Sequence, residues 1–335
     1  MSESLVNASA VAPWIAAQTQ ALLTQRGHAW LLAGPSGLGQ YELALALVRA
    51  WLCDHATAQG ACGHCSSCHA IDVHAHADLC VLMPETVMLA LNWPLSEKAQ
   101  DEIDGKKRKA SKEIRVDAMR DAVEFAQRTS ARGRGKAVLV FPAERMNVYT
   151  ANALLKTLEE PAGDVKFVLA SDAAHQLLPT IRSRCLGHTM TWPDQASALN
   201  WLQGQGVPTN QAVVMLRAAG GRPEDALQFA PIAGLWSRLP RAVQAGDVSV
   251  LKDWTPAQTV DALHKLCHDL LALRSGAGPR FFEAADLPQP GGWQALSDWA
   301  KSLSETMRTV EHPFNTGLMQ EALVSQAQLA LNTKS

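Results

Sequence analysis

Six residues near the start of the chain, Gly34-Pro-Ser-Gly-Leu-Gly39, restrict its fold more than any other stretch. The apolar run Ala29–Ala33 comes directly before them and predicts a short buried strand. The segment Tyr41–Cys53 follows them and is rich in Ala and Leu, which favour a helix. A strand, a glycine loop and a helix in this order are typical of a phosphate-binding loop. The motif therefore predicts an α/β P-loop domain.

The residues after the glycine loop lack the chemistry of a working P-loop. Such a loop continues with a Lys that contacts the β- and γ-phosphates and a Ser or Thr that binds Mg²⁺. Here the first position holds Gln40, which carries no charge. The second holds Tyr41, whose hydroxyl lies too far from the backbone to replace that of a Ser or Thr. The later strand Lys136–Phe141 should end in an Asp-Glu pair, but Glu144 lies beyond the expected position. We therefore expect no bound ATP, with residual nucleotide binding by the loop amides as the alternative. The degenerate loop consists of Gly34, Gly39, Gln40 and Tyr41.

Strand and helix patterns alternate over residues 28–190, which predicts an α/β domain with a largely parallel sheet. After Trp192 the strand signal disappears and only helical patterns follow. We therefore expect an α/β domain over residues 1–190, a small helical domain over 191–233 and a larger helical domain over 234–335. Residues 90–113 are expected to form an irregular insertion. Further strands are expected over 79–83, 136–141 and 166–170, and helices over 11–23, 114–128, 151–158 and 178–184.

Four of the seven cysteines follow the spacing C-x8-C-x2-C-x2-C. Four thiolates close a tetrahedral Zn²⁺ shell, and the two-residue gaps let neighbouring thiolates share one ion. A closed shell leaves no position for water, so we expect a structural metal. Chance clustering of reduced thiols and a redox pair of two of these cysteines, Cys62 and Cys65, are the alternatives. The predicted ligands are Cys53, Cys62, Cys65 and Cys68, in an insertion over residues 53–68.

The other cysteines and the nearby histidines are expected to stay outside this site. Cysteines without a local partner behave as small buried hydrophobic residues, and this is expected of Cys80, Cys185 and Cys267. Histidines in a polar loop are expected to be exposed to solvent, and this applies to His64, His69, His74 and His76.

Composition and charge exclude several classes of protein. The sequence has no run of 18 or more apolar residues, so we expect no membrane span. Its start lacks the basic region and apolar core of a signal peptide, which predicts a cytoplasmic protein with reduced thiols. The formal net charge is -2. Because there is no overall basic excess, binding to nucleic acid through charge alone is not expected.

Three stretches resemble the clamp-loader branch of the bacterial AAA+ proteins. They are ANALLKTLEEP over residues 151–161, KFVLASD with LLPTIRSRC over 166–185, and the cysteine set after the P-loop helix. In addition, HPFNTGLMQEALVSQ over residues 312–326 is similar to the last collar helix of that family. The resemblance is strong over residues 28–190 and weaker but collinear to the end.

This resemblance implies a RecA-like AAA+ domain over residues 1–190, a helical lid over 191–233 and a helical collar that joins subunits over 234–335. It implies that the four cysteines bind zinc. It also implies an arginine finger in Ser183-Arg184-Cys185. Arg184 would stabilise charge on a γ-phosphate held by a neighbouring subunit. The alternatives are that Arg182 is the finger, or that Arg184 only pairs with a carboxylate of its own domain.

The resemblance and the degenerate loop together predict a clamp-loader subunit of the DNA polymerase III holoenzyme, a nucleotidyltransferase, that does not hydrolyse ATP itself. Implied partners are gamma or tau motor subunits and a delta subunit in a heteropentamer, the sliding clamp, and primer-template DNA through the complex. No ATPase activity is expected of the isolated chain. An ATP-binding motor subunit of the same assembly is the alternative, which Gln40 and Tyr41 disfavour. A zinc deaminase would need a His-x-Glu near the cysteines, and the sequence has none there.

The segment KKRKASK over residues 106–112 carries five positive charges in a stretch that looks longer than the family needs. Its functional interpretation is a contact with primer-template DNA. Runs of like charge are more often solvated and disordered, so we expect a disordered loop here.

Overall fold

The structure is a computed structural model that describes residues 11–310, 312 and 315–333. The chain divides into two compact units, unit 1 over Met1–Pro193 and unit 2 over Asp194–Ser335. The expected boundaries after residues 190 and 233 stay predictions. The first ten residues, where no signal peptide is expected, and two residues of the collar-like motif, Pro313 and Phe314, lie outside the described residues.

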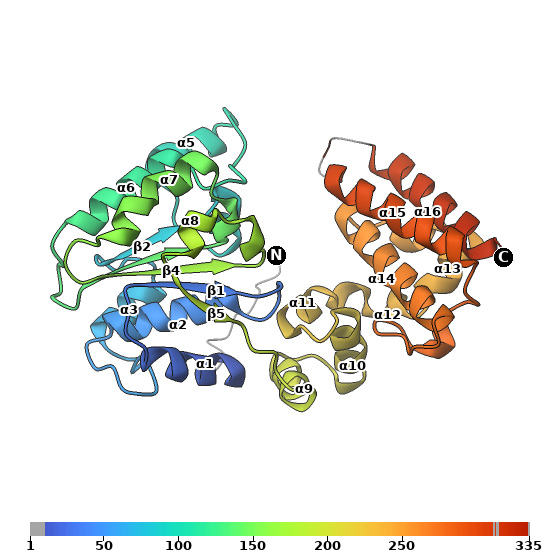
Figure 1. Ribbon diagram of the computed structural model, residues 1–335, viewed down its shortest axis with the longest axis horizontal. Coiled ribbons are helices and arrows are strands. Elements are labelled where there is room, and N and C mark those ends of the chain that lie inside the picture. Colours follow the sequence, from blue (N-terminus) through green and yellow to red (C-terminus); the bar gives the residue numbers. More distant parts are fainter. Residues whose placement is uncertain (1–10, 311, 313–314, 334–335) are drawn as a thin grey trace. The chain divides into compact units, whose positions relative to one another are not determined.

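Unit 1 is built around a five-stranded parallel sheet in the order β2-β3-β4-β1-β5 (Figure 1). β1 lies between β4 and β5, so that Leu31 is in register with both Leu169 and Gly187. The parallel direction brings the ends of β1, β3 and β4 to the same edge, where ligands bind in α/β proteins. The strands are β1 (Ala29–Ala33), β2 (Leu79–Leu82), β3 (Lys136–Val140), β4 (Val165–Ser171) and β5 (Leu186–Thr189).

The parallel α/β sheet predicted from the sequence is confirmed. The four expected strands, among them Ala29–Ala33, coincide with β1 to β4 to within one residue at each end. β5 was not expected from the sequence, because its residues are mostly exposed and form no apolar run. A strand with one neighbour can present such residues, and among the described strands β5 pairs only with β1.

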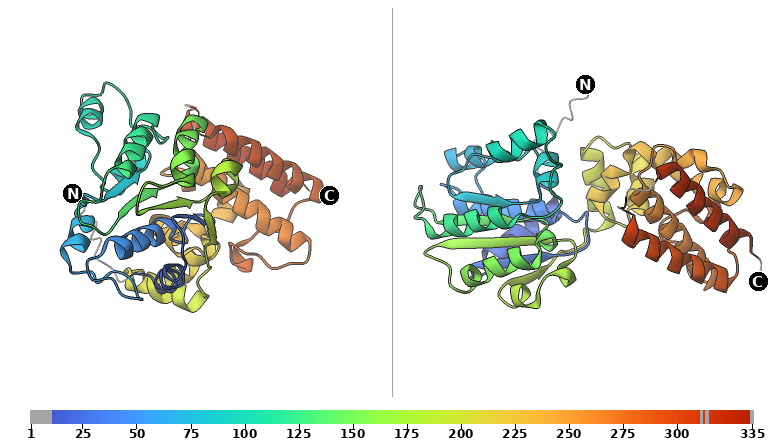
Figure 2. Two further views of the ribbon diagram at one scale, coloured as in Figure 1. Left: turned by 60° about the vertical axis from the view of Figure 1, so that its left-hand side comes forward. Right: turned by 90° about the horizontal axis from the view of Figure 1, so that it is seen from above.

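Helices cover both faces of the sheet of unit 1, with α1 and α2 on one face and α6 and α7 on the other (Figures 1 and 2). Helix α7 begins three residues before the expected start because the Asn147 side chain accepts a hydrogen bond from the Thr150 N–H. The insertion expected to be irregular contains a helix, α5, capped by Ser96. The helices are α1 (Pro13–Leu23), α2 (Gln40–Leu52), α3 (Ser66–Asp72), α4 (Glu85–Ala90), α5 (Glu97–Asp104), α6 (Val116–Gln127), α7 (Val148–Glu159) and α8 (Pro179–Arg182), with short 3₁₀ turns at Ala143–Arg145 and Ala174–Gln176.

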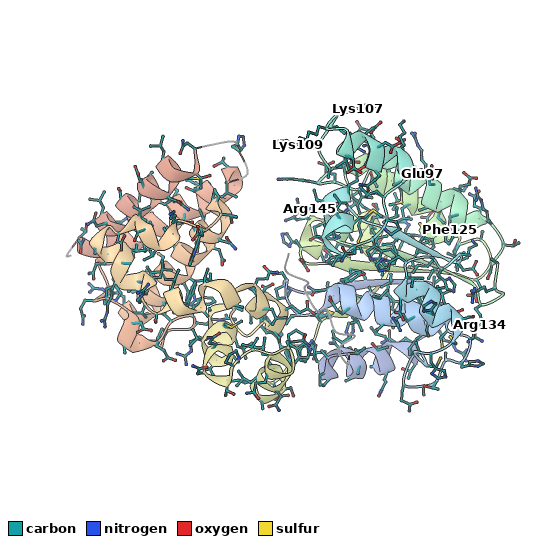
Figure 3. The ribbon with its side chains drawn as sticks, turned by 180° about the vertical axis from the view of Figure 1, so that it is seen from behind. Glu97, Lys107, Lys109, Phe125, Arg134 and Arg145 are labelled. Atoms are coloured by element: carbon teal, nitrogen blue, oxygen red, sulfur yellow. The ribbon has the colours of Figure 1, made fainter. Side chains whose placement is uncertain are left out.

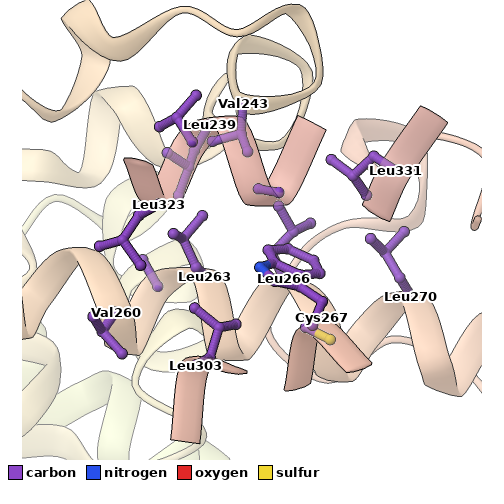
Figure 4. Close-up of a cluster of buried hydrophobic side chains, with 14 of the residues drawn as sticks. Leu239, Val243, Val260, Leu263, Leu266, Cys267, Leu270, Leu303, Leu323 and Leu331 are labelled. Carbon is purple, nitrogen blue, oxygen red and sulfur yellow. The ribbon is translucent and has the colours of Figure 1, made fainter. Parts of the chain in front are cut away.

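The described residues of unit 2 form helices and no strand, as expected. A small cluster of apolar side chains, including Leu202 and Met215, joins α9, α10 and α11. A larger core packs the later helices together, with Leu263, Leu266 and Leu323 among its fully or almost fully buried residues (Figure 4). No helix of the described residues is long and apolar enough to span a membrane. The helices are α9 (Gln195–Gly204), α10 (Thr209–Ala218), α11 (Pro223–Gln228), α12 (Ala233–Trp236), α13 (Leu239–Ala245), α14 (Pro256–Arg274), α15 (Trp293–Thr309) and α16 (Thr316–Asn332), with 3₁₀ turns at Ala230–Ile232, Val248–Leu251 and Ala284–Asp286.

Candidate functional site

The side chain of Gln40 is hydrogen-bonded to the backbone of the glycine loop. Its Nε2 donates hydrogen bonds to the carbonyl oxygens of Gly34 at 2.9 Å and Pro35 at 2.8 Å. The residue is only 2% exposed. In a working P-loop a Lys at this position reaches the phosphates. Here both amide hydrogens are used within the loop, so the Gln40 side chain offers no donor to a phosphate.

The hydroxyl of Tyr41 is also engaged within unit 1. It accepts a hydrogen bond from Trp93 Nε1 at 2.8 Å, and the Tyr41 ring lies 5.4 Å from the ring of Phe141. Burial raises the pKa of Tyr41 to about 12, against a smaller opposing effect of the Trp93 hydrogen bond. A neutral, buried phenol is a poor ligand for Mg²⁺, which prefers charged or small oxygen ligands.

The carboxylate of Glu144 links the ends of two central strands. Glu144 Oε2 accepts a hydrogen bond from Ser171 Oγ at 2.6 Å, and Oε1 accepts one from the Asp172 N–H at 3.3 Å. The residues directly after β3 are Phe141, Pro142 and Ala143, none of which can ligate a metal through its side chain. Glu144 therefore has structural partners, and it follows the end of β3 later than the position where a P-loop enzyme activates water.

The structure brings the four predicted cysteine ligands together, with their sulfur atoms within 4.8 Å of one another. Cys53 Sγ lies 3.7 Å from both Cys65 Sγ and Cys68 Sγ. Zn–S bonds of about 2.3 Å in a tetrahedron place sulfur atoms about 3.8 Å apart. The spacing is far too long for a disulfide, whose S–S bond is about 2.05 Å. The donor set therefore fits a tetrahedral metal ion bound by four thiolates.

Backbone N–H groups point at two of these sulfurs. The Cys62 N–H donates to Cys53 Sγ at 3.3 Å, and the Cys68 N–H donates to Cys65 Sγ at 3.4 Å at the start of α3. Burial raises the pKa of Cys65, but hydrogen bonds from the Cys68 backbone and other neighbours outweigh it and bring the pKa to about 6. These contacts stabilise the thiolate of Cys65, which is the form that binds metal, whereas burial raises the pKa of Cys53 and of Cys68.

The nearby histidines differ from expectation in two positions. His64 and His69 are exposed as predicted, and the described metal-ligand cluster contains no histidine. His76 is buried, its Nδ1 accepts a hydrogen bond from the Asp78 N–H at 3.1 Å, and its burial lowers its pKa. His74 is half-buried and stacks on Trp93, with ring centroids 3.8 Å apart.

The three remaining cysteines are only partly as expected. Cys267 is buried, as predicted, within the core of unit 2. Cys80 and Cys185 are half-buried, since each lies at the margin of the core of unit 1.

Arg184 is the second residue after the end of α8, at the surface of unit 1. Its guanidinium forms an ion pair with Glu159 at the end of α7, and its Nη1 donates to the Thr180 carbonyl at 2.8 Å. The side chain is 30% exposed, and it lines an open pocket of about 470 Å³ with His28 and Ser183. The guanidinium is thus accessible from outside but has an internal partner. A pairing of Arg184 with a carboxylate of its own domain was one of the alternatives expected above, but no signal in the sequence singles out Glu159.

Arg182 differs from Arg184 in its contacts. It is exposed, and among the described residues no ion pair or hydrogen bond of its guanidinium is found. The structure therefore brings Arg184, but not Arg182, into a defined position beside the pocket.

The basic segment after α5 is held by ion pairs, which corrects the expected disordered loop. Arg108 donates to Glu85 Oε1 at 2.8 Å and to Glu102 Oε2 at 2.7 Å. The Arg108 hydrogen bonds hold the pKa of Glu85 below its ordinary value. Lys107 and Lys109 are exposed on this loop (Figure 3). One of the five positive charges therefore fixes the segment, and the sequence alone does not identify it.

Comparison with known proteins gives a consistent group of relatives. A family model described as "DNA polymerase III, delta subunit" matches residues 15–191, which is more than half of the chain. DNA polymerase III subunit delta' of Pseudomonas aeruginosa is 39% identical over 220 residues, which cover 63% of this chain and 58% of that protein. The subunit of the same name in Escherichia coli is 28% identical over 343 residues, which cover 95% and 94%.

More distant relatives carry other subunit names. DNA polymerase III subunit tau of Salmonella typhimurium is 33% identical over 159 residues, 48% of this chain and 21% of that protein. This chain spans less than two thirds of the Pseudomonas relative and of its Haemophilus influenzae counterpart, at 58% and 54%. A gamma subunit-related protein of Thermotoga maritima has a solved structure with a TM-score of 0.49 at 15% identity, covering 95% of this chain and 99% of that one.

Proposed function

The chain belongs to the DNA polymerase III delta subunit family, within its delta-prime branch, and on this premise we propose that it is a clamp-loader subunit that does not hydrolyse ATP. The observation that carries this proposal is the Gln40 amide, which occupies the glycine loop and bonds to the carbonyl oxygens of Gly34 and Pro35. Tyr41 and Glu144 already have hydrogen-bond partners within unit 1. The site therefore lacks both the hydroxyl that would bind Mg²⁺ and the carboxylate that would activate water for hydrolysis.

The proposed mechanism is charge stabilisation in trans. A guanidinium presented across a subunit interface can stabilise the negative charge that develops on a γ-phosphate during hydrolysis. Arg184 meets the requirement of an accessible arginine at a fixed place on the surface of unit 1. It would leave Glu159 when a neighbouring motor subunit presents bound ATP, because a phosphate offers the guanidinium more negative charge.

The proposed assembly follows from the family. Residues 191–233 would form the lid and residues 234–335 the collar that joins this chain to gamma or tau motor subunits and a delta subunit. One apolar cluster is centred on α9–α11 and another on α12–α16, and the two meet at Ala218 and Phe229; this supports two packing groups within unit 2. The assembled complex would load the sliding clamp onto primed DNA, and this role in replication would place the protein in the cytoplasm.

The four cysteines are proposed to bind one structural Zn²⁺ ion. Four buried or half-buried sulfurs at tetrahedral spacing support this ion and leave no position for a substrate or water. The bound ion would cross-link the end of α2, at Cys53, to the start of α3, at Cys65 and Cys68.

Two measurements test the proposal. The isolated chain is titrated with a fluorescent ATP analogue in the presence of Mg²⁺, and the ATPase rate of purified motor subunits is measured with and without this chain. We expect no Mg²⁺-dependent binding to the isolated chain and a higher ATPase rate of the complete assembly. Tight Mg²⁺-dependent binding by the isolated chain would instead favour the alternative, an ATP-binding motor subunit of the same assembly.

A further inference from the structure

The loop before β3, which is far along the chain from the cysteines, contacts both segments that carry them. Arg134 Nη2 donates a hydrogen bond to the Cys53 carbonyl oxygen at 2.6 Å. Arg132 Nη1 donates to Ser66 Oγ at 2.8 Å and to Ser67 Oγ at 3.1 Å. The two serines lie between Cys65 and Cys68. We propose that Arg132 and Arg134 are positioning residues that hold the cysteine ligands in their metal-binding arrangement.

The loop that carries these arginines is itself fixed to the sheet. Asp78 is fully buried just before β2, and its carboxylate accepts hydrogen bonds from the Ala131 N–H at 2.7 Å and the Arg132 N–H at 2.8 Å. The Ser130 hydroxyl donates to the same carboxylate at 3.0 Å. Lys136, the first residue of β3, places its Nζ 3.7 Å from Asp78. Arg132 is therefore presented from an anchored backbone, and Arg134 follows it closely before β3.

Two serine hydroxyls link Arg132 to the carboxylate of Asp54, beside the cysteine ligands. Asp54, next to Cys53, accepts hydrogen bonds from the hydroxyls of Ser66 at 3.1 Å and Ser67 at 2.8 Å. Arg132 donates to these same hydroxyls. The two serines therefore connect a carboxylate beside the first ligand to a guanidinium on the anchored loop. This network ties the segment that carries Cys53 to the segment that carries Cys65 and Cys68.

The charges of the site give the arginines a second role. Four thiolates around one Zn²⁺ ion have a formal charge of -2, and Asp54 adds another negative charge beside them. The two guanidinium groups bring positive charge that offsets this negative charge. Figure 3 shows Arg134 at the opposite end of unit 1 from Lys107 and Lys109, so the exposed lysines after α5 do not take its place. Partners outside the ligand shell of a metal commonly change its affinity by about 10- to 100-fold.

The test measures the zinc affinity of the full chain and therefore rests on the proposed zinc site. Zinc-loaded protein is titrated with a chromophoric chelator to give an apparent dissociation constant. We expect Arg134→Ala to weaken zinc binding by about tenfold, and the double variant with Arg132→Ala to weaken it further. The zinc affinity of Arg134→Lys should lie between those of Arg134→Ala and the unsubstituted chain, because lysine keeps the positive charge but not the planar guanidinium group. The matched control is Arg128→Ala. Arg128 begins the same loop and is an exposed ion-pair partner of Glu124, so its loss should leave the zinc affinity unchanged.

A spectroscopic readout separates positioning from general loss of stability. With Co²⁺ in place of zinc, the absorption of tetrahedral thiolate coordination should change in Arg134→Ala but not in Arg128→Ala. Should Arg134→Ala fail to fold, Arg134→Lys serves as the test variant. Unchanged affinity and unchanged Co²⁺ spectra in the arginine variants, with zinc bound by the unsubstituted chain, would overturn this inference alone. An unsubstituted chain that binds no zinc would overturn the zinc site itself and the inference with it.

Discussion

The guanidinium of Arg184 is paired with the carboxylate of Glu159, 25 residues earlier in the chain. The pair joins the segment that follows α8 to the end of α7 and lies at the surface. As the proposed arginine finger, Arg184 would be neutralised by its own subunit in this state. It would have to exchange Glu159 for a phosphate before acting on a neighbouring ATP site, so Glu159 would compete with the substrate.

Replacing Glu159 with Gln should therefore release the finger. Exposed ion pairs contribute about 0.2–1 kcal/mol, which corresponds to a change in the available guanidinium of at most about fivefold. We expect Glu159→Gln to raise the ATPase rate of the reconstituted complex by up to this factor. Glu160→Gln, at the adjacent exposed position, is the control and should have no effect. A marked fall in rate with Glu159→Gln would mean that Glu159 orients Arg184 for catalysis instead of competing for it.

Gln40 should contribute to the stability of unit 1. Replacing it with Ala leaves two loop carbonyl oxygens, those of Gly34 and Pro35, without their donor. The loss of a buried hydrogen-bond partner typically costs about 1–3 kcal/mol. We expect urea unfolding to show a decrease of this size in the free energy of unfolding. Gln100→Ala, which removes only a contact with Asp104 at the surface, should change it little, and equal effects of the two variants would contradict the role of Gln40.

The Glu85–Arg108 pair should make stability depend on pH. The hydrogen bonds from Arg108 lower the pKa of Glu85 in the folded state, so the carboxylate stabilises the fold above its ordinary pKa of about 4.3. This contribution is lost as the pH falls through the lower, folded-state pKa. We expect Glu85→Gln to reduce the free energy of unfolding by about 1.5–3 kcal/mol at pH 7, and by progressively less below pH ~4. A difference between the two proteins that stays constant from pH 7 to pH 3 would contradict this.

Removal of the metal should destabilise unit 1 without unfolding unit 2. Cys68→Ser replaces one of the four sulfur ligands at the start of α3. We expect this variant to purify with no stoichiometric zinc by elemental analysis, and to unfold at a lower temperature than the zinc-loaded chain. Cys80→Ser, outside the ligand set, should retain one zinc ion per chain. Full zinc content in Cys68→Ser would show that the ligand set is wrong.

Features that depend on contiguous residues were predictable from the sequence. Buried apolar runs such as Ala29–Ala33 identify strands because both faces of a parallel sheet are covered. The cysteine spacing identifies candidate ligands because cysteines separated by two residues in a tight turn can share one ion. The exposed strand β5 has neither property and was missed.

Contacts between distant segments were not predictable. Arg134 meets the carbonyl of Cys53, 81 residues earlier, through a loop whose glycines and arginines suggest only a surface turn. Gly135 has a φ of 80°, and a Cβ there would lie 2.5 Å from the Asp164 carbonyl oxygen. The sequence shows the glycine but not the close approach that requires it. Likewise, the choice of Glu159 as the partner of Arg184 depends on where α7 and α8 end in space.

The most direct test of the proposed role is the effect of Arg184→Ala on ATP hydrolysis by the adjoining motor subunit. The variant is reconstituted with its partner subunits under conditions in which only that motor subunit has a working P-loop, and Arg182→Ala serves as the matched control. We predict that Arg184→Ala folds normally and lowers the rate at this site by a factor on the order of 10³, while Arg182→Ala has little effect. Unchanged hydrolysis and clamp loading with Arg184→Ala, or the same loss with Arg182→Ala alone, would contradict the assignment of Arg184 as the finger.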